Sequence, residues 1–259
     1  MQADIKYWGF AVPNQNQTHD LGLDPNLIGM SRSEMFLASC TNILRNTYGF
    51  MESVEIGAAV DHRGQPLPLY TYPAIEYLVQ LDVGDKRVFE FGSGGSTIFW
   101  MKRAGEVVTV ENNRDWCDKL SPQLNERVRL IYAEGDDFPR TIRDADGEFD
   151  VIIVDGAGYR YDCAAEAVAK LARGGLIVLD NSDWHPNTAA LLKQSGLLQV
   201  DMTGFKPSYS HTSTTSLFFH REFDFPAIGD RQPAYGMGAK CLHSVEWDKP
   251  LLPADESAD

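Results

Sequence analysis

The sequence predicts an α/β fold: a seven-stranded, mostly parallel sheet with an antiparallel last strand and helices on both faces. From residue 71 onward, short apolar segments alternate with segments of helical periodicity, which is typical of chains that build parallel sheets. The last two apolar segments have no helix between them. Because short connections join antiparallel strands, we expect these two to form a hairpin.

The expected strands are short and rich in valine, isoleucine and phenylalanine, residue types that favour sheets. They span residues 87–91, 107–111, 128–132, 150–155, 176–180, 197–202 and 216–220. The fourth is almost wholly apolar, as a strand buried on both faces requires. The connector between the last two strands, residues 204–215, has the composition of a loop.

The expected helices lie between these strands. They span residues 72–81, 97–104, 114–126, 164–172 and 187–194, and an earlier helix spans 33–48. Pro73 falls in the first turn of its helix, where proline is tolerated. Ser31 or Ser33 is suited to cap the earliest helix, and Gly174-Gly175 to end the one over 164–172.

The chain divides into three expected parts. Residues 1–70 are expected to be an N-terminal extension of helix and loop, and residues 71–225 the ligand-binding domain. Residues 226–259 are a C-terminal tail that either wraps the domain or is partly disordered.

Charge narrows the classes of partner. The chain has 23 Lys and Arg against 37 Asp and Glu, a net charge of −14. Such a charge repels phosphate backbones and anionic lipids, so we expect no nucleic acid and no membrane partner. No apolar run approaches the roughly 20 residues of a membrane span. The N-terminus lacks the features of a secretory signal, so a cytoplasmic location is expected. The oligomeric state is open, with a homodimer among the alternatives.

A glycine-rich loop follows the first expected strand, and we call residues 90–97 the glycine loop. Its sequence is Glu90-Phe91-Gly92-Ser93-Gly94-Gly95-Ser96-Thr97. Ligands of α/β proteins bind at the carboxyl ends of parallel strands, where glycines let the backbone approach closely. Glu111 ends the second strand, where an acid can accept hydrogen bonds from ribose hydroxyls. Glu90 lies inside an apolar strand, where a carboxylate requires a partner.

This pattern resembles the E-x-G-x-G motif and the following acid of class I S-adenosylmethionine-dependent methyltransferases. The resemblance implies a Rossmann-like sheet and S-adenosylmethionine as the cofactor. It places the loop beneath the methionine part, Glu90 near the amino group and Glu111 on the ribose. It also implies that an acid after the third strand, Asp136 or alternatively Asp137, binds the adenine amino group, unless that segment is only a solvated turn. The residues implied to bind the cofactor are Glu90, Gly92, Ser93, Gly94, Ser96, Thr97, Glu111, Asp136 and Asp155.

A nicotinamide dinucleotide fold is the rival interpretation, since it also requires glycines and an acid about 20 residues later. The third glycine of its G-x-G-x-x-G motif would fall at Thr97, and it gives no reason for Glu90.

Acidic and amide groups end the fourth and fifth strands, at Asp155 and at Asp180-Asn181. These positions resemble the metal ligands of the branch that includes catechol O-methyltransferase. The resemblance implies Mg²⁺, which favours oxygen ligands. It departs at Gly158, where that branch has a lysine base. The alternative is that Asp155 contacts cofactor or substrate directly, and that Asp180-Asn181 cap the next element.

The catalytic residues predicted are Asp155 and His185, since histidine titrates near neutral pH. Asp183 and His211 are alternative bases, and Arg160 pairs either with an anionic substrate group or with a nearby acid. Aromatic residues either line the rim of the site or pack ordinarily. They are Tyr70, Tyr72, Tyr159, Tyr161, Trp184 and Tyr209.

The expected reaction is O-methylation of a small molecule or a glycan. N-methylation and a catalytically silent cofactor-binding protein are the alternatives. The segments from Asp155 to Asp183 also resemble uncharacterised bacterial methyltransferases, which do not identify the acceptor.

Overall fold

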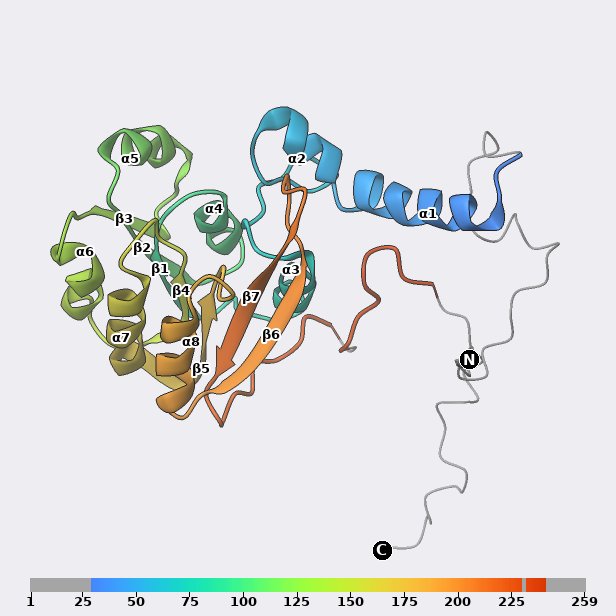
Figure 1. The fold of residues 1–259 in the computed structure, drawn as a ribbon. Helices are drawn as coiled ribbons and strands as arrows, with labels where there is room; N and C mark the ends of the chain where they lie inside the picture. The colour runs from blue at the N-terminus through green and yellow to red at the C-terminus, as the bar shows by residue number, and fades with distance from the viewer. Residues whose placement is uncertain (1–28, 230–231, 241–259) are drawn as a thin grey trace, which may run out of the picture.

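The computed structural model describes residues 29–229 and 232–240, and it shows a seven-stranded sheet (Figure 1). The strand order is β3-β2-β1-β4-β5-β7-β6. Neighbours among the first five strands are parallel, and β7 is antiparallel to both β5 and β6. The predicted fold class is therefore confirmed, including the terminal hairpin. The strands are β1 (Arg87–Phe91), β2 (Glu106–Glu111), β3 (Val128–Tyr132), β4 (Phe149–Val154), β5 (Leu171–Leu179), β6 (Leu198–Phe205) and β7 (Thr212–Phe219).

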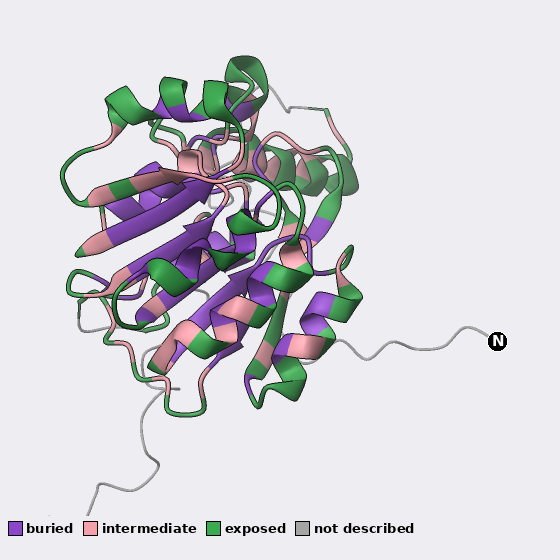
Figure 2. Ribbon diagram, turned by 90° about the vertical axis from the view of Figure 1, so that its left-hand side faces the viewer, coloured by how far each residue is buried: buried purple, intermediate pink, exposed green. Residues whose placement is uncertain are grey.

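Helices cover both faces of the sheet, and their inner sides are buried (Figure 2). One face packs against α3 (Tyr72–Leu78) and α4 (Gly95–Met101), and the other against α6 (Asp137–Arg140), α7 (Arg160–Lys170) and α8 (Pro186–Gln194). The remaining helices are α1 (Arg32–Asn42), η3 (Ile43–Thr47), α2 (Phe50–Ile56), α5 (Arg114–Leu120), η4 (Ser121–Gln123) and η5 (Thr141–Asp144).

The sequence placed most elements within a few residues, and the differences have local causes. The helix expected over 164–172 begins at Arg160 and ends at Lys170, and Gly174-Gly175 lie inside β5 rather than in a helix cap. A Cβ at Gly175 would lie 2.6 Å from the carbonyl oxygen of Asp150, so glycine allows the two strands to approach. Strands β6 and β7 leave only residues 206–211 as their connector, which is shorter than expected.

The N-terminal segment begins with α1, which has no buried residue. Ser31 caps it, because the Ser31 hydroxyl accepts from the amide of Glu34 while the Glu34 carboxylate accepts from the amide of Ser31. Further along, Leu67 and Tyr70 are buried in the core that faces α3. The division at residues 70 and 71 stays a prediction, which the packing of Tyr70 makes worth testing.

The described part of the C-terminal tail runs along α3. The carbonyl of Pro226 accepts from the amide of Asp82 at 2.8 Å, and the amide of Met237 donates to Glu76 at 3.0 Å. Glu76 also accepts from the hydroxyl of Tyr48, so it joins the N-terminal segment as well as the tail to α3. Residues 1–28 and 241–259, parts of the expected extension and tail, lie outside the described residues. Within the described ranges, no helix is long and apolar enough to cross a membrane.

Candidate cofactor and acceptor site

The glycine loop turns at Gly92, which has a φ of +92°. A Cβ there would lie 2.8 Å from the Cα of Gly156, in the segment after β4. The amide of Gly92 donates to the carbonyl of Val110 at 2.9 Å. Only glycine satisfies both the positive φ and the close approach, so the ends of β1 and β4 meet at this residue.

Glu90 is completely buried beneath the loop. Its Oε2 accepts from the hydroxyl of Thr97 at 2.5 Å and from that of Thr109 at 3.1 Å. Its Oε1 has no hydrogen-bond partner among the described residues. Burial raises the pKa of Glu90 to about 7, against the opposing effect of the nearby hydroxyls of Ser96, Thr97 and Thr109. A buried carboxyl oxygen without a partner is suited to accept a hydrogen bond from a bound ammonium group.

Thr97 connects Glu90 to the rest of the loop. Its hydroxyl donates to Glu90 and accepts from the amide of Gly94 at 2.9 Å. Ser96, the preceding residue, is also buried at the start of α4. The loop is therefore anchored through side chains that belong to its own motif.

Glu111 holds the loop from the β2 side. Its Oε2 accepts from the amide and the hydroxyl of Ser93, both at 2.9 Å, and its Oε1 accepts from the amides of Asn112 and Asn113, both at 3.0 Å. A ribose hydroxyl that replaced the Ser93 hydroxyl would meet the same oxygen. The indole of Trp116 donates to the Ser93 carbonyl at 2.9 Å, a contact that the sequence did not indicate.

Two aromatic residues expected at the rim are buried instead. Tyr70 and Tyr72 are 0% and 3% exposed, and neither hydroxyl has a hydrogen-bond partner among the described residues. The pKa of Tyr70 lies well above its usual value because of burial, with the charges of Glu90 and Asp155 adding to the effect. Tyr70 and Tyr72 are therefore core residues on the face of the sheet that packs against α3. The sequence around an aromatic residue near the start of a helix does not indicate how deeply its side chain is buried.

Asp136 is exposed at the N-terminus of α6, where its side chain makes no capping bond. Phe138, two residues later, is buried and would lie 3.0 Å from a Cβ at Gly156. The segment after β3 thus comes close to the segments after β1 and β4. The adenine-binding role of Asp136 stays a prediction.

Asp155 ends β4 and pairs with Arg160, with 2.9 Å between Oδ1 and Nη2. Burial and the neighbouring Asp180 raise the pKa of Asp155, while the Arg160 guanidinium lowers it. The guanidinium also donates to carbonyl oxygens at the ends of β4 and β5. They belong to Val154, Asp155, Gly156 and Asp180. Of the two roles considered for Arg160, the structure shows pairing with a local acid.

Asp180, at the end of β5, is 1% exposed and forms an ion pair with Lys206, which is 2% exposed. Its other oxygen accepts from the hydroxyl of Thr215 at 2.7 Å. Asn181 has a φ of +52°. In the amide orientation that satisfies its neighbours, Asn181 donates to Asp180 at 2.8 Å and accepts from Lys206 at 3.0 Å. Lys206 lies in the segment that the sequence identified only as a loop.

The predicted metal ligands come together, but they do not fit a divalent cation. Asp155, Asp180 and Asn181 are each engaged by a positively charged side chain. Over the ranges that the structure describes, no group of three or more His, Cys, Asp or Glu side chains is arranged to hold a metal ion. The Mg²⁺ prediction is therefore not supported, because protein cations already balance these acids.

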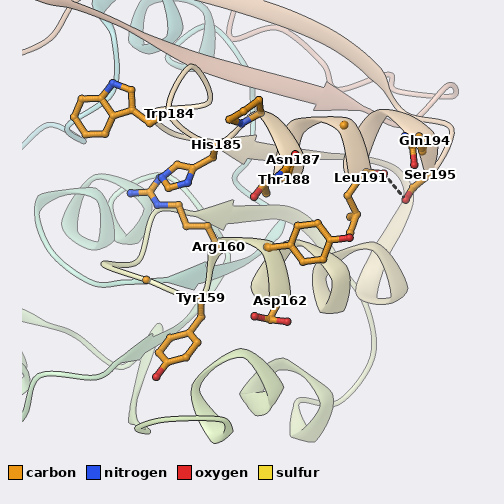
Figure 3. A pocket seen from close by; sticks show the side chains of 14 residues that line it. Tyr159, Arg160, Asp162, Trp184, His185, Asn187, Thr188, Leu191, Gln194 and Ser195 are labelled. Atoms are coloured by element: carbon orange, nitrogen blue, oxygen red, sulfur yellow. Dashed lines mark hydrogen bonds between the residues drawn. The ribbon is translucent and has the colours of Figure 1, made fainter.

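A pocket of about 930 Å³ lies between the start of α7 and one side of α8 (Figure 3). Tyr159, Tyr161 and Trp184 line it and are 44%, 50% and 59% exposed. His185 also lines it, and Figure 3 shows its imidazole beside the Arg160 guanidinium. Burial, together with the positive charge of Arg160, lowers the pKa of His185. The imidazole is therefore neutral at pH 7 and able to accept a proton.

The two alternative bases differ in their surroundings. Asp183 accepts from the hydroxyl of Ser213 at 3.2 Å and from the amide of Thr214 at 3.1 Å, so it supports the start of β7. His211 is exposed and its ring lies 5.3 Å from that of Tyr209. Neither lines the large pocket, whereas His185 does.

Comparisons with known proteins find only a distant likeness to solved structures. A scan against protein-family models finds no match, and a search of curated proteins finds none. Similar solved structures include precorrin-6y C5,15-methyltransferase from Geobacter metallireducens, with 17% identity, a TM-score of 0.46, and coverage of 57% of this chain and 86% of that one. The O-methyltransferase TomG from Streptomyces achromogenes has 16% identity, a TM-score of 0.47, and coverage of 69% and 88%. The N-methyltransferase NodS from Bradyrhizobium japonicum has 14% identity, a TM-score of 0.43, and coverage of 56% of this chain and 92% of that one. At these identities and TM-scores the likeness assigns neither a family nor an activity to this chain.

Proposed function

We propose that this protein is an S-adenosylmethionine-dependent methyltransferase. The observation that carries the proposal is Glu90, a buried carboxyl group beneath a glycine loop whose Oε1 lacks a hydrogen-bond partner in the described chain. The strand order adds support, because β7 lies antiparallel between β5 and β6. A dinucleotide-binding sheet has a parallel sixth strand in place of that hairpin.

The residues present fit this cofactor at three points. Glu90 would accept from its amino group, the loop from Gly92 to Gly94 would lie under its methionine part, and Glu111 would accept from its ribose. When bound, the cofactor supplies an electrophilic methyl group on a sulfonium. The chain's own contribution is to hold that group and the acceptor in line, which is the main source of acceleration in such a transfer.

The acceptor proposed is an oxygen of a small molecule or a glycan. Tyr159, Tyr161 and Trp184 offer exposed rings around the large pocket, and sugars and aromatic rings both stack on such surfaces. His185 lines the same pocket in its neutral form, so it is the base proposed to take the acceptor proton. Asp155, the other catalytic residue proposed, pairs with Arg160, which neighbours His185. An amine acceptor, giving N-methylation, is compatible with the same pocket.

Calorimetry with S-adenosylhomocysteine tests the cofactor assignment. We expect one molecule to bind per chain, and Glu111→Ala to weaken binding at least tenfold, because it removes the ribose acceptor and two bonds to Ser93. Glu126 is an exposed acid in the segment that connects β2 to β3. Glu126→Ala is therefore the matched control and should bind as the wild type does. No heat with either the cofactor or its demethylated product would refute the proposal.

A catalytically silent cofactor-binding protein is the second candidate, since the acceptor is unidentified. It would bind the cofactor but transfer no methyl group to any member of a broad acceptor panel. The absence of a nucleic acid partner stays a prediction that rests on the charge of −14. The cytoplasmic location also stays a prediction, and the oligomeric state stays open.

A further inference from the structure

Four charged side chains meet at the ends of β4 and β5, and we call Asp155, Arg160, Asp180 and Lys206 the charged cluster. The two ion pairs in it are Asp155 with Arg160 and Asp180 with Lys206. Lys206 and Asp180 are almost wholly shielded from solvent. A lysine is rarely buried to this extent unless it is paired. Its presence at this edge of the sheet therefore needs an explanation beyond surface charge.

The contacts of Lys206 coincide with the oxygens that a cation would take. Its ammonium pairs with Oδ2 of Asp180, and it donates to the side-chain oxygen of Asn181 at 3.0 Å. The hydroxyl of Thr215 occupies Oδ1 of Asp180 at 2.7 Å. A hard divalent cation would have to displace the ammonium from both oxygens.

The net charge of the charged cluster also disfavours a divalent cation. Two carboxylates are balanced by one guanidinium and one ammonium, so the cluster is formally neutral as it stands. A divalent cation at Asp180 would add two positive charges beside a buried ammonium. Repulsion between like charges is strong where solvent does not screen it, so Lys206 opposes the cation as well as replacing it.

We propose that Lys206 is a built-in cation that replaces a divalent metal at the ends of β4 and β5, and that it positions Asp180 and Asn181 there. The position of this cluster next to the acceptor pocket matters only if the proposed methyl transfer is correct. The cation-replacing role itself does not depend on that function. Lys206 is thus a positioning residue, and the methyl transfer proposed above would proceed in the presence of a chelator.

Mn²⁺ binding tests the proposal without an acceptor or a cofactor. It is measured as the loss of the electron paramagnetic resonance signal of free Mn²⁺. The wild type should hold no tight Mn²⁺. Lys206→Ala should gain one site per chain that binds at least tenfold tighter than anything in the wild type, because Asp180 and Asn181 become free. Asp180→Asn in the Lys206→Ala background should remove that site. Lys193→Ala, which removes an exposed lysine on α8, controls for the change in net charge.

Two outcomes overturn the proposal: a tight Mn²⁺ site in the wild type that Asp180→Asn abolishes, or a folded Lys206→Ala variant that gains no site. If Lys206→Ala does not fold, as circular dichroism would reveal, nuclear magnetic resonance on the wild type decides. Mn²⁺ should not selectively broaden the amide resonances of Asp180 and Asn181, and selective broadening there would refute the built-in cation. Failure of cofactor binding, by contrast, would affect only the proposed function.

Discussion

Glu90 is a fully buried carboxyl group beneath the glycine loop. Desolvation raises its pKa to about 7, and only one of its two oxygens is hydrogen-bonded by the described chain. The folded protein therefore retains a proton that the unfolded chain loses near pH 4.5. Glu90 contributes its stability in full below that pH, and the contribution is lost as the pH rises through 7.

Cofactor affinity should follow the ionisation of Glu90. A bound ammonium favours the carboxylate, so binding releases a proton at acidic pH, and affinity should rise by up to about tenfold per unit between pH 5.5 and 7. Glu90→Gln should bind S-adenosylhomocysteine at least tenfold more weakly at pH 7.5 and with little pH dependence. Calorimetry across this range is the measurement, and an unchanged pH dependence in Glu90→Gln would contradict the role.

The same variant separates binding from stability. Glu90→Gln lacks the titrating group, so its stability relative to the wild type should increase from pH 4.5 to 7, by up to about 3 kcal/mol. Urea unfolding at several pH values without cofactor gives this difference. Weak binding by a variant that is more stable than the wild type could not be attributed to misfolding.

At the scale of elements, the site is made where the ends of β1, β4 and β5 meet. Gly92 and Gly156 allow the first two to touch, and Arg160 joins the last two by donating to backbone carbonyls of both. These contacts bring residues far apart in the sequence to one edge of the sheet. Two substitutions, each with a matched control, test whether these contacts stabilise the protein.

Gly92→Ala should destabilise the protein more than a positive φ alone explains. A left-handed φ costs a non-glycine residue about 1–2 kcal/mol, and here the new Cβ would also lie 2.8 Å from Gly156. Gly196→Ala is the control, since its φ of +88° is similar and no atom lies within 4 Å of the new Cβ. Urea unfolding should show a loss at least about 1 kcal/mol greater for Gly92→Ala. Equal losses would show that the close approach does not matter.

Arg160→Met should be strongly destabilising, by about 3–5 kcal/mol, because it leaves Asp155 and several carbonyls without their donor. Arg143→Met is the matched control. Arg143 also pairs with an acid, Glu166, but its side chain is 58% exposed, whereas that of Arg160 is 11% exposed. The control should lose less than about 1 kcal/mol. Thermal denaturation of both variants measures the stability that each one loses. Similar losses would show that Arg160 does not hold the ends of β4 and β5 together.

At the scale of the whole molecule, segments from both sides of the central domain in the sequence pack on α3. Leu67 and Tyr70 contribute buried side chains from the N-terminal side, and Glu76 binds Tyr48 and Met237 together. Helix α1, in contrast, buries no residue and extends away from the sheet (Figure 1). The folding unit is therefore expected to begin between α1 and residue 71.

Two truncated chains test where this unit begins. A chain of residues 43–259 lacks α1 but keeps Tyr48, Leu67 and Tyr70, and it should unfold within a few degrees of the full chain. A chain of residues 71–259 loses all three, including a tyrosine that is 0% exposed, and should lose at least about 3 kcal/mol or fail to fold. Thermal denaturation monitored by circular dichroism is the measurement. A stable chain of residues 71–259 would instead support the boundary expected from the sequence.

The sequence by itself determined the fold class and singled out the residues of the candidate cofactor site. The predicted bounds of β1 and β3 coincide with those observed, because strong apolar segments between turn residues identify strands locally. Glu90, Thr97 and Glu111 could be singled out because their motif is continuous or ends an adjacent strand. Asp155 and Asp180 could be expected to meet, because parallel neighbours end at the same edge.

Only the tertiary structure decided what those acids contact and which aromatic residues are exposed. Lys206 follows Asp180 by 26 residues and reaches it because β7 lies antiparallel between β5 and β6. Tyr70 is buried because the segment before α3 packs against the core on that face of the sheet. Burial and pairing depend on which distant segments pack together, and local periodicity contains no information about that packing. For this reason the sequence indicated a metal at the place where the folded chain holds a lysine.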